Sequence, residues 1–252
     1  MVGRVEKYIL DKIEEDGAVH MTLIDPEKVT PPSASRIVRE AESCKTAAIM
    51  VGGSTFVSTS HLDMVVKAVR KTVNIPVILF PNNVTGISKH ADAIWFMSLL
   101  NSSDPYFLIG AQVLGAPLIK RFGLEAIPMG YIVVGEGSAV SVVGRAVPIP
   151  YDKPELAAAH ALAAQYLGMR FVYLEAGSGA KQPVPNDMIR TVKHATNIPL
   201  IVGGGIRTGE QVKEIVGAGA DIIVTGTVVE ECRVKDKIRE LVENTKFRGK
   251  GT

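Results

Sequence analysis

Short runs of apolar, largely β-branched residues recur along the whole chain and alternate with longer segments of helical periodicity. The runs cover residues 18–24, 47–52, 76–80, 93–98, 125–134, 171–176, 199–204 and 221–226. Several are apolar at almost every position, which is typical of strands buried on both faces of a parallel sheet. Regular alternation of such strands with helices predicts a sheet built from βα units.

Four of the intervening segments have clear helical features. Residues 31–44 open with prolines, 61–72 carry apolar residues at helical spacing, and 154–168 begin with proline and end with glycine. Residues 207–220 directly follow a glycine-rich turn. Eight strands in 252 residues predict one α/β domain over residues 1–252, a (β/α)8 or TIM barrel.

Two connections depart from this pattern. Residues 81–91 are rich in asparagine and glycine and form a poor helix, so we expect a loop in place of one barrel helix there. Residues 135–152 make a long excursion of small residues and prolines. Long loops in compact domains are usually functional lids or disordered segments, and we favour a role in covering the substrate.

Composition excludes several classes of protein. A formal net charge of +2 is too balanced to indicate a nucleic-acid partner. Two distant cysteines, Cys44 and Cys232, predict a reduced, cytoplasmic protein. The charged first 17 residues lack the apolar region of a signal peptide, and no window approaches the roughly 20 apolar residues of a membrane span. Transient contact with a membrane surface stays open.

Two glycine-rich strand ends lie close together in the last quarter of the chain, IVGGGIRTGE (201–210) and IIVTGTVVEE (222–231). Glycine lets backbone N–H groups approach an anion, and a following helix directs its positive end to the same place. Such turns after strands seven and eight of a barrel predict a phosphate cradle.

Strand six adds candidate chemistry to this cradle. The period of a strand places Tyr173 and Glu175 on the same side, where a carboxylate and a phenol would converge. A glutamate in an apolar strand is costly unless it is paired or functional, so we favour a catalytic or ligand role over a structural ion pair. The run AGSGA (176–180) would supply free N–H groups and the Ser178 hydroxyl.

Further candidates follow the first strands. Asp25 ends strand one and either caps the next turn or binds a metal or substrate, and Ser54 offers a hydroxyl after strand two. Oxygen ligands of this kind suit a hydrated Mg²⁺. His20 is interpreted as a core histidine, Trp95 as core or groove lining, and Arg207 as facing either an anion or solvent.

The motifs HMTLIDPEK (20–28), VGGS (51–54), YLEAGSGA (173–180), VGGGIRTGE (202–210) and VTGTVVEE (224–231) together resemble the geranylgeranylglyceryl phosphate synthase family over nearly the whole chain. This resemblance implies a Mg²⁺-dependent prenyltransferase of archaeal ether-lipid synthesis. The 3-hydroxyl of sn-glycerol 1-phosphate would attack C1 of geranylgeranyl diphosphate, and diphosphate would leave. A homo-oligomer is also implied.

Carried onto this sequence, the resemblance implies Asp25 and Ser54 as Mg²⁺ ligands, with Glu175 accepting the proton and Tyr173 positioning the substrate. Residues implied to hold glycerol phosphate are Tyr173, Leu174, Glu175, Ala176, Gly177, Ser178, Gly179, Gly204, Gly205, Gly226 and Thr227. The prenyl tail would occupy a groove formed by strands two to four and residues 107–119.

One departure and two alternatives remain. Bacterial relatives that make heptaprenylglyceryl phosphate carry a lysine just before the DP motif, where this chain has Leu23 and Ile24, which favours the C20-using branch. Another phosphate-binding barrel enzyme, such as an aldolase or an isomerase pairing His20 with Glu175, is the first alternative. A non-catalytic phosphate-binding module is the second, although two carboxylates beside the cradle would repel an anion.

Overall fold

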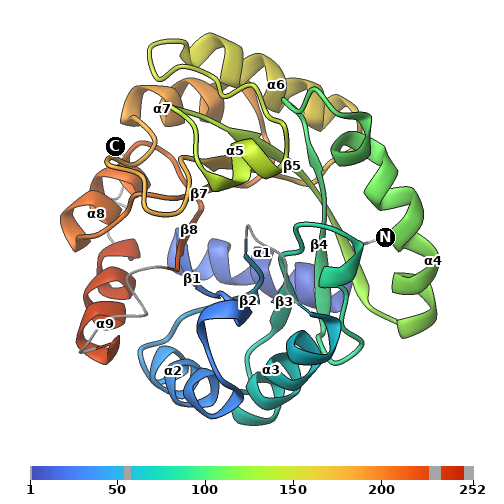
Figure 1. Ribbon diagram of the computed structural model, residues 1–252. Coiled ribbons are helices and arrows are strands. Elements are labelled where there is room, and N and C mark those ends of the chain that lie inside the picture. The colour runs from blue at the N-terminus through green and yellow to red at the C-terminus, as the bar shows by residue number, and fades with distance from the viewer. Residues whose placement is uncertain (1, 54–57, 227–233, 247–252) are drawn as a thin grey trace.

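Eight parallel strands close into a barrel in chain order, as seen end-on in Figure 1. The computed structural model describes residues 2–53, 58–226 and 234–246. The strands are β1 (Val19–Ile24), β2 (Ala48–Val51), β3 (Val77–Leu79), β4 (Ala93–Leu99), β5 (Glu125–Val133), β6 (Phe171–Glu175), β7 (Leu200–Gly203) and β8 (Ile222–Thr225). Seven fall within a predicted apolar run and β4 extends one residue beyond its run, so the predicted fold is confirmed.

Helices surround the barrel as an outer layer (Figure 1). They are α2 (Pro31–Ser43), α3 (Thr59–Thr72), α4 (Ala111–Phe122), α6 (Pro154–Tyr166), α7 (Asn186–Ala195), α8 (Gly209–Gly217) and α9 (Val234–Thr245). The four helices expected from sequence are confirmed within a few residues. Sequence-encoded caps fix their starts: Thr30 and Ser33 form a capping box at α2, and Thr208 and Gln211 form one at α8.

The connection after β3 contains a single 3₁₀ turn, η2 (Val84–Gly86), where a barrel helix would stand. The expected replacement of a helix by a loop is therefore confirmed. After β4 the chain forms a π-helical turn, η3 (Tyr106–Gly110), that runs directly into α4. These two irregular segments lie next to each other in the barrel order, and they leave space between the barrel wall and α4.

The long excursion after β5 contains a short helix, α5 (Ala139–Val143), which lies across the barrel mouth in Figure 1. Its returning segment is tied to the barrel side, since Ile149 N donates to Val133 O of β5 at 3.1 Å and Val147 N donates to Asn101 O, just after β4, at 2.8 Å. The covering position agrees with the expectation for residues 135–152, whereas the helix was not recognised in sequence. A substrate-covering role stays a prediction.

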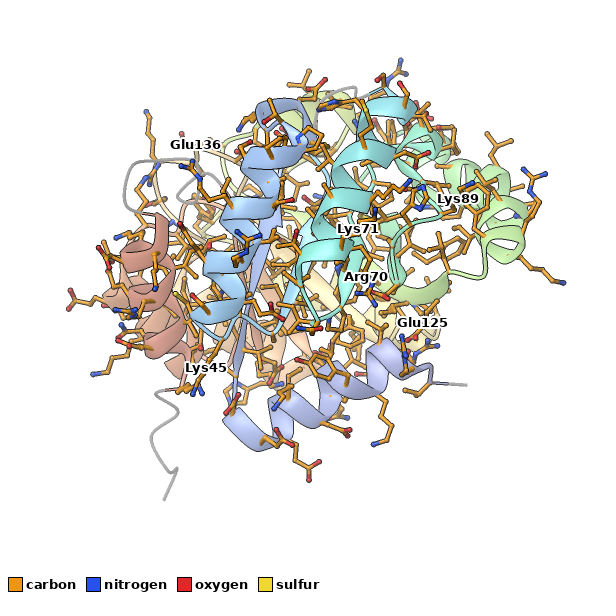
Figure 2. The ribbon with its side chains drawn as sticks, turned by 90° about the horizontal axis from the view of Figure 1, so that it is seen from below. Lys45, Arg70, Lys71, Lys89, Glu125 and Glu136 are labelled. Carbon is orange, nitrogen blue, oxygen red and sulfur yellow. The ribbon has the colours of Figure 1, made fainter. Side chains whose placement is uncertain are left out.

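Helix α1 (Arg4–Asp16) closes the opposite end of the barrel. Figure 2 shows it below the strands, with Glu125 near its first turn and Glu136 at the far end of the molecule. Val5 and Ile9 are buried against the barrel interior. The Glu125 carboxylate accepts hydrogen bonds from the backbone N–H groups of Val5 and Glu6, both at 2.8 Å, and so caps the helix. In the part of the chain that the structure describes, α1 covers the amino end of the barrel and the cavity opens at the carboxyl end.

Inward-pointing side chains fill the lower barrel, among them Met21, Met50, Ile78, Trp95, Ile127, Phe171, Ile201 and Ile222. The same alternation brings smaller or polar residues inward near the strand ends, so the interior is packed below and hollow above. Across the described ranges, no helix combines the length and apolar character required to cross a bilayer.

Candidate active site

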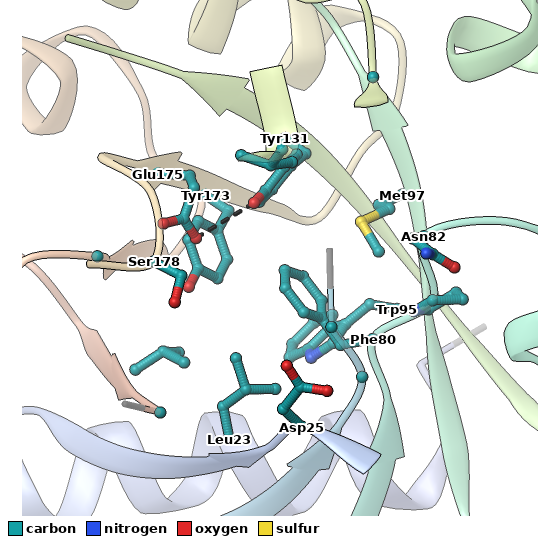
Figure 3. A pocket seen from close by; sticks show the side chains of 18 of the residues that line it. Leu23, Asp25, Phe80, Asn82, Trp95, Met97, Tyr131, Tyr173, Glu175 and Ser178 are labelled. Carbon is teal, nitrogen blue, oxygen red and sulfur yellow. Dashed lines mark hydrogen bonds between the residues drawn. The ribbon is translucent and has the colours of Figure 1, made fainter. Parts of the chain in front are cut away.

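A cavity of about 600 Å³ opens at the carboxyl ends of the strands. Its two sides differ. The side formed by β6–β8 is glycine-rich and polar, with Glu175, Ser178, Gly179, Gly204, Gly205, Thr208 and Gly226. The other side is mostly apolar, with Asn82 and Gln112 among its lining residues, and includes Phe80, Ile87, Trp95, Phe96, Met97, Phe107, Ala111, Gly115 and Ile119. Figure 3 shows Glu175 and Ser178 facing Trp95 and Met97 across this space.

Glu175 is the buried charge of the site, at 7% exposure. Its Oε1 accepts a hydrogen bond of 2.6 Å from the Gly177 backbone N–H, and its Oε2 accepts one of 3.1 Å from the Tyr131 hydroxyl. Burial raises the pKa of Glu175 above its ordinary value, and the hydrogen bonds from Gly177, Tyr131 and Tyr173 oppose that rise. The result is a fixed carboxylate that is more basic than an exposed one.

Three aromatic rings support this carboxylate. Phe80 stacks on Tyr173 with ring centroids 5.5 Å apart, and Tyr131 meets Tyr173 edge-on at 5.1 Å. Burial raises the pKa of Tyr131 and of Tyr173 well above 10, with the nearby Glu175 charge adding to it, so both phenols stay protonated hydrogen-bond donors. Gly203 permits this packing, since a side chain there would collide with the Tyr173 hydroxyl.

The glycines after β7 adopt conformations that only glycine tolerates easily. Gly204 and Gly205 have φ values of +85° and +72°. A β-carbon at Gly204 would lie 2.5 Å from the Gly177 nitrogen, and one at Gly205 would lie 2.5 Å from the Gln182 carbonyl oxygen. The turn after β7 and the loop after β6 therefore touch backbone to backbone, and the approach of either segment to an anion stays a prediction.

The structure brings most of the predicted cradle residues to the cavity and separates others from it. Tyr173, Glu175, Ser178, Gly179, Gly204, Gly205 and Gly226 line the cavity, together with Asp25. Leu174 and Ala176 instead point outward into the core between the barrel and its helices. Two other predicted site residues, Ser54 and Thr227, lie outside the described residues, as does Cys232.

The expectation that the run 176–180 supplies free N–H groups is wrong for three of its five residues. Ala176 donates to Gly203 O at 3.0 Å, Ala180 donates to Gly177 O at 3.1 Å, and Gly177 donates to Glu175. Gly177 therefore acts on the site through Glu175, because the carboxylate folds back over its own strand end and captures the nearest donor.

Asp25 has the capping role weighed from sequence, and its role as a metal or substrate ligand stays a prediction. Its carboxylate caps the turn η1 (Pro26–Lys28) by accepting from Glu27 N at 3.1 Å, and it lies 3.7 Å from the Lys28 ammonium. It also faces the cavity (Figure 3). A β-carbon at Gly53 would come within 2.7 Å of Asp25 Oδ1, so the absence of a side chain there keeps one face of the carboxylate accessible.

This arrangement fits a magnesium ion that is held by one carboxylate and completed by water and substrate phosphates. Within the described residues, no three His, Cys, Asp or Glu side chains gather into a group that could hold a metal by itself. Asp25, with its accessible oxygen at the cavity rim, is the described residue among those predicted from sequence that could act as a ligand.

The apolar side of the cavity matches the groove expected for residues 107–119. Phe107, Ala111, Gly115 and Ile119 lie on one face of η3 and α4 and line it, and Ile87 of the loop after β3 packs opposite Gly115. The groove thus occupies the space left where a barrel helix is missing. Trp95 lines it as well as belonging to the core, so both interpretations of that residue hold.

Two site residues were not identified from sequence as such. Tyr131 was counted as part of an apolar strand, and its pairing in register with Tyr173 brings its hydroxyl to Glu175. Arg207, left open between anion and solvent, lines the cavity. The sequence did contain a signal for Tyr131. Strand alternation directs its side chain into the barrel, and a tyrosine there has a hydroxyl that needs a hydrogen-bond partner.

His20 is confirmed as a core histidine. Its ring nitrogens lie 3.0 Å from the Thr46 hydroxyl and 2.8 Å from the Thr225 hydroxyl, and it does not line the cavity. Burial lowers its pKa to about 3, so it stays neutral. An isomerase that pairs His20 with Glu175 is therefore excluded by the structure.

A closed (β/α)8 barrel with a buried carboxylate between a glycine-rich and an apolar wall defines an enzyme of the phosphate-handling barrel class. More narrowly, the chain belongs to the PcrB family, whose model matches residues 10–245.

Relatives with named activities cover almost the full chain. It is 57% identical over 247 residues to a geranylgeranylglyceryl phosphate synthase of Thermofilum pendens, covering 98% of this chain and 96% of the relative. It is 56% identical over 242 residues to the Pyrococcus abyssi enzyme of the same name, covering 96% of each. A crystal structure of (S)-3-O-geranylgeranylglyceryl phosphate synthase from Thermoplasma acidophilum with substrate sn-glycerol-1-phosphate has a TM-score of 0.93 and 44% identity, covering 98% of this chain and 99% of that one.

Proposed function

We propose that this protein is a prenyltransferase that joins sn-glycerol 1-phosphate to geranylgeranyl diphosphate, forming geranylgeranylglyceryl phosphate for archaeal ether phospholipids. The observation that carries the proposal is the position of Glu175, a buried carboxylate where the glycine-rich wall meets the apolar cavity. The relatives named geranylgeranylglyceryl phosphate synthase support the same activity.

Each wall suits one substrate. The glycine turns at Gly204 and Gly205 let backbone approach a phosphate, and the start of α8 adds its positive end. The apolar wall suits a long isoprenoid tail, which gains free energy by leaving water. With the two substrates placed in this way, the 3-hydroxyl of the glycerol and C1 of the prenyl chain meet beside Glu175.

The chemistry needs a base at that point. As the 3-hydroxyl oxygen bonds to C1, the C1–oxygen bond to diphosphate breaks, and the hydroxyl proton passes to a Glu175 carboxylate oxygen. The raised pKa of Glu175 favours accepting this proton, while Tyr131 holds Oε2 in place. Tyr173 packs beside the carboxylate and would position the glycerol.

Mg²⁺ is part of the proposal. Asp25 would hold it at the cavity rim, with Ser54 as the second protein ligand implied by the family resemblance. Bound there, the ion would neutralise negative charge on the leaving diphosphate. We also propose that the enzyme works as a homo-oligomer in the cytoplasm and receives its prenyl substrate near a membrane surface.

A prenyl-transfer assay tests the function. Radiolabelled sn-glycerol 1-phosphate is incubated with prenyl diphosphates of 10, 15, 20 and 35 carbons, with and without Mg²⁺, and the sn-glycerol 3-phosphate enantiomer serves as the substrate control. We expect C20 transfer that is abolished by EDTA, restored by Mg²⁺ and absent with the enantiomer. Asp25→Asn should raise the Mg²⁺ concentration needed for half-maximal activity.

If none of the prenyl diphosphates is transferred although glycerol phosphate still binds, the synthase assignment is wrong and a phosphate-binding module is favoured. Full activity in EDTA would instead remove the Mg²⁺ part alone. An Asp25→Asn enzyme with an unchanged Mg²⁺ requirement would show that Asp25 acts only as the cap of η1.

A further inference from the structure

The Arg207 guanidinium bridges the two segments that form the glycine-rich wall. Its Nη2 donates to Ala180 O at 2.7 Å, and its Nη1 donates to Lys181 O and to Gly205 O, both at 3.3 Å. Two of these carbonyls belong to the loop after β6, and the third belongs to the turn after β7. A single planar side chain therefore connects loop and turn.

The base of this side chain is itself anchored. Arg207 N donates to Gln211 Oε1 at 2.7 Å, and Gln211 is part of the capping box that starts α8. The bridge thus extends from a helix start, a rigid element, across to the loop after β6. No residue of that loop from Gly177 to Gln182 is part of a helix or strand, so its backbone position depends on such contacts.

The positive charge of Arg207 lies at the cavity. Across residues 2–53, 58–226 and 234–246 its side-chain partners are the three backbone carbonyls, and no carboxylate pairs with it. It lines the cavity beside Ser178, Gly179 and Gly205. A bound phosphate would therefore meet a site whose shape is fixed by the guanidinium and whose potential is made positive by it.

We infer that Arg207 is a positioning residue for the glycerol phosphate: its guanidinium holds the loop after β6 against the turn after β7, and this sets the geometry of the phosphate site. The inference rests on the proposed function only in taking the phosphate of sn-glycerol 1-phosphate as the anion. The planar fork of arginine can bridge three carbonyls at once, whereas the single ammonium of lysine cannot span them.

Arg207→Lys and Arg207→Gln together separate bridging from charge. The lysine variant keeps the charge and loses the bridge, and the glutamine variant loses both. Arg190→Gln is the matched control, because Arg190 is an exposed arginine on α7 that pairs only within its helix, with Asp187 at 3.8 Å, and does not line the cavity.

Calorimetric titration with sn-glycerol 1-phosphate should show binding weakened about tenfold in both Arg207 variants, the loss expected for more than one hydrogen bond. Arg190→Gln should bind as the unmodified protein does. In the transfer assay, KM for glycerol phosphate should rise by a similar factor, with kcat and the KM of the prenyl diphosphate unchanged. Thermal midpoints should match, since the bridge lies at the surface.

Limited trypsin digestion gives a second readout. The bond after Lys181 lies in the bridged loop, and its cleavage, followed by mass spectrometry, should be faster in both Arg207 variants than in the control. Glycerol phosphate affinity retained by Arg207→Lys would overturn the bridging role in favour of charge alone. Affinity retained by Arg207→Gln would overturn the inference entirely. If the unmodified protein binds glycerol phosphate but transfers no prenyl group, the proposed function is wrong, and the inference about Arg207 is unaffected.

Discussion

The two walls of the cavity are built by different means. On the β6–β8 side the chain uses backbone, with glycines at positive φ and two segments in contact through main-chain atoms. On the β3–β5 side it uses side chains, and a missing barrel helix supplies the volume. We therefore expect the first wall to accept a small charged group of fixed shape, and the second to accept apolar chains of different lengths.

This difference predicts how substitutions in each wall affect substrate binding. This backbone-built wall tolerates few changes at its closest contacts, because a β-carbon at Gly204 or Gly205 would meet main-chain atoms that cannot move away easily. A side-chain-built wall can be reshaped by changing one residue for a larger one. Glu175 lies at the junction between the walls. We expect the reaction of the two substrates to depend on the presence and the position of its carboxylate.

The largest effect is expected at that junction. Glu175→Gln keeps the size of the side chain and removes the base, so kcat should fall by about 10²- to 10⁴-fold. Calorimetry should show glycerol phosphate still bound, which separates loss of chemistry from loss of the wall. An activity within threefold of the unmodified enzyme would mean that another group accepts the proton.

Gly205→Ala should break the backbone-built wall specifically. The new β-carbon would meet the Gln182 carbonyl, so we expect KM for glycerol phosphate to rise about tenfold while KM for the prenyl diphosphate stays constant. Gly123→Ala is the control, since Gly123 also has positive φ (+68°) but has nothing within 4 Å of its would-be β-carbon. It should lose about 1–2 kcal/mol of stability and leave both KM values unchanged.

Gly115→Leu should affect the apolar wall and change the preference for prenyl chain length. Its side chain would enter the apolar cavity near Ile87, where a β-carbon already lies 3.1 Å from Cδ1. Excluding about two methylenes of the tail, at about 0.8 kcal/mol each, should lower use of the C20 relative to the C15 diphosphate about tenfold. Val113→Leu, on the exposed face of α4, should leave the chain-length profile as it is.

Tyr131→Phe should give the smallest change and show how the junction is tuned. The hydrogen bond from Tyr131 lowers the pKa of Glu175, against the larger effect of burial, so its removal raises that pKa. Because the base must be ionised, the acidic limb of the kcat/KM profile should move to higher pH. At neutral pH the loss should be about two- to tenfold. A limb that moves to lower pH, or stays in place, would contradict this account.

Much of the fold was predictable because its signals are local. Buried parallel strands reveal themselves as apolar runs, and the missing helix after β3 followed from a segment that is poor in helix formers. Helix α1 was not predicted, and its N-terminal cap comes from Glu125, which lies 120 residues away from Val5. No local pattern contains that contact.

The location of the candidate site was predictable where residue type alone is informative. Glu175 and the glycines were identified because a buried carboxylate and a glycine-rich turn are more often part of a functional site than of the structural core. Tyr131 was missed because its role depends on the pairing of β5 with β6. The error at residues 176–180 has a similar cause, since a side chain that folds back onto Gly177 competes with any ligand for the same N–H.

The closure of the barrel has a consequence for how the protein is made. His20 on β1 and Thr225 on β8 share a hydrogen bond across 205 residues of sequence. During synthesis β1 therefore stays without its second neighbouring strand until nearly the whole chain has left the ribosome. Contacts of such long range are slow to form, and an unpaired strand edge can associate with other chains in the meantime. We expect refolding yield to fall with increasing protein concentration, because the last strand is needed to seal the first.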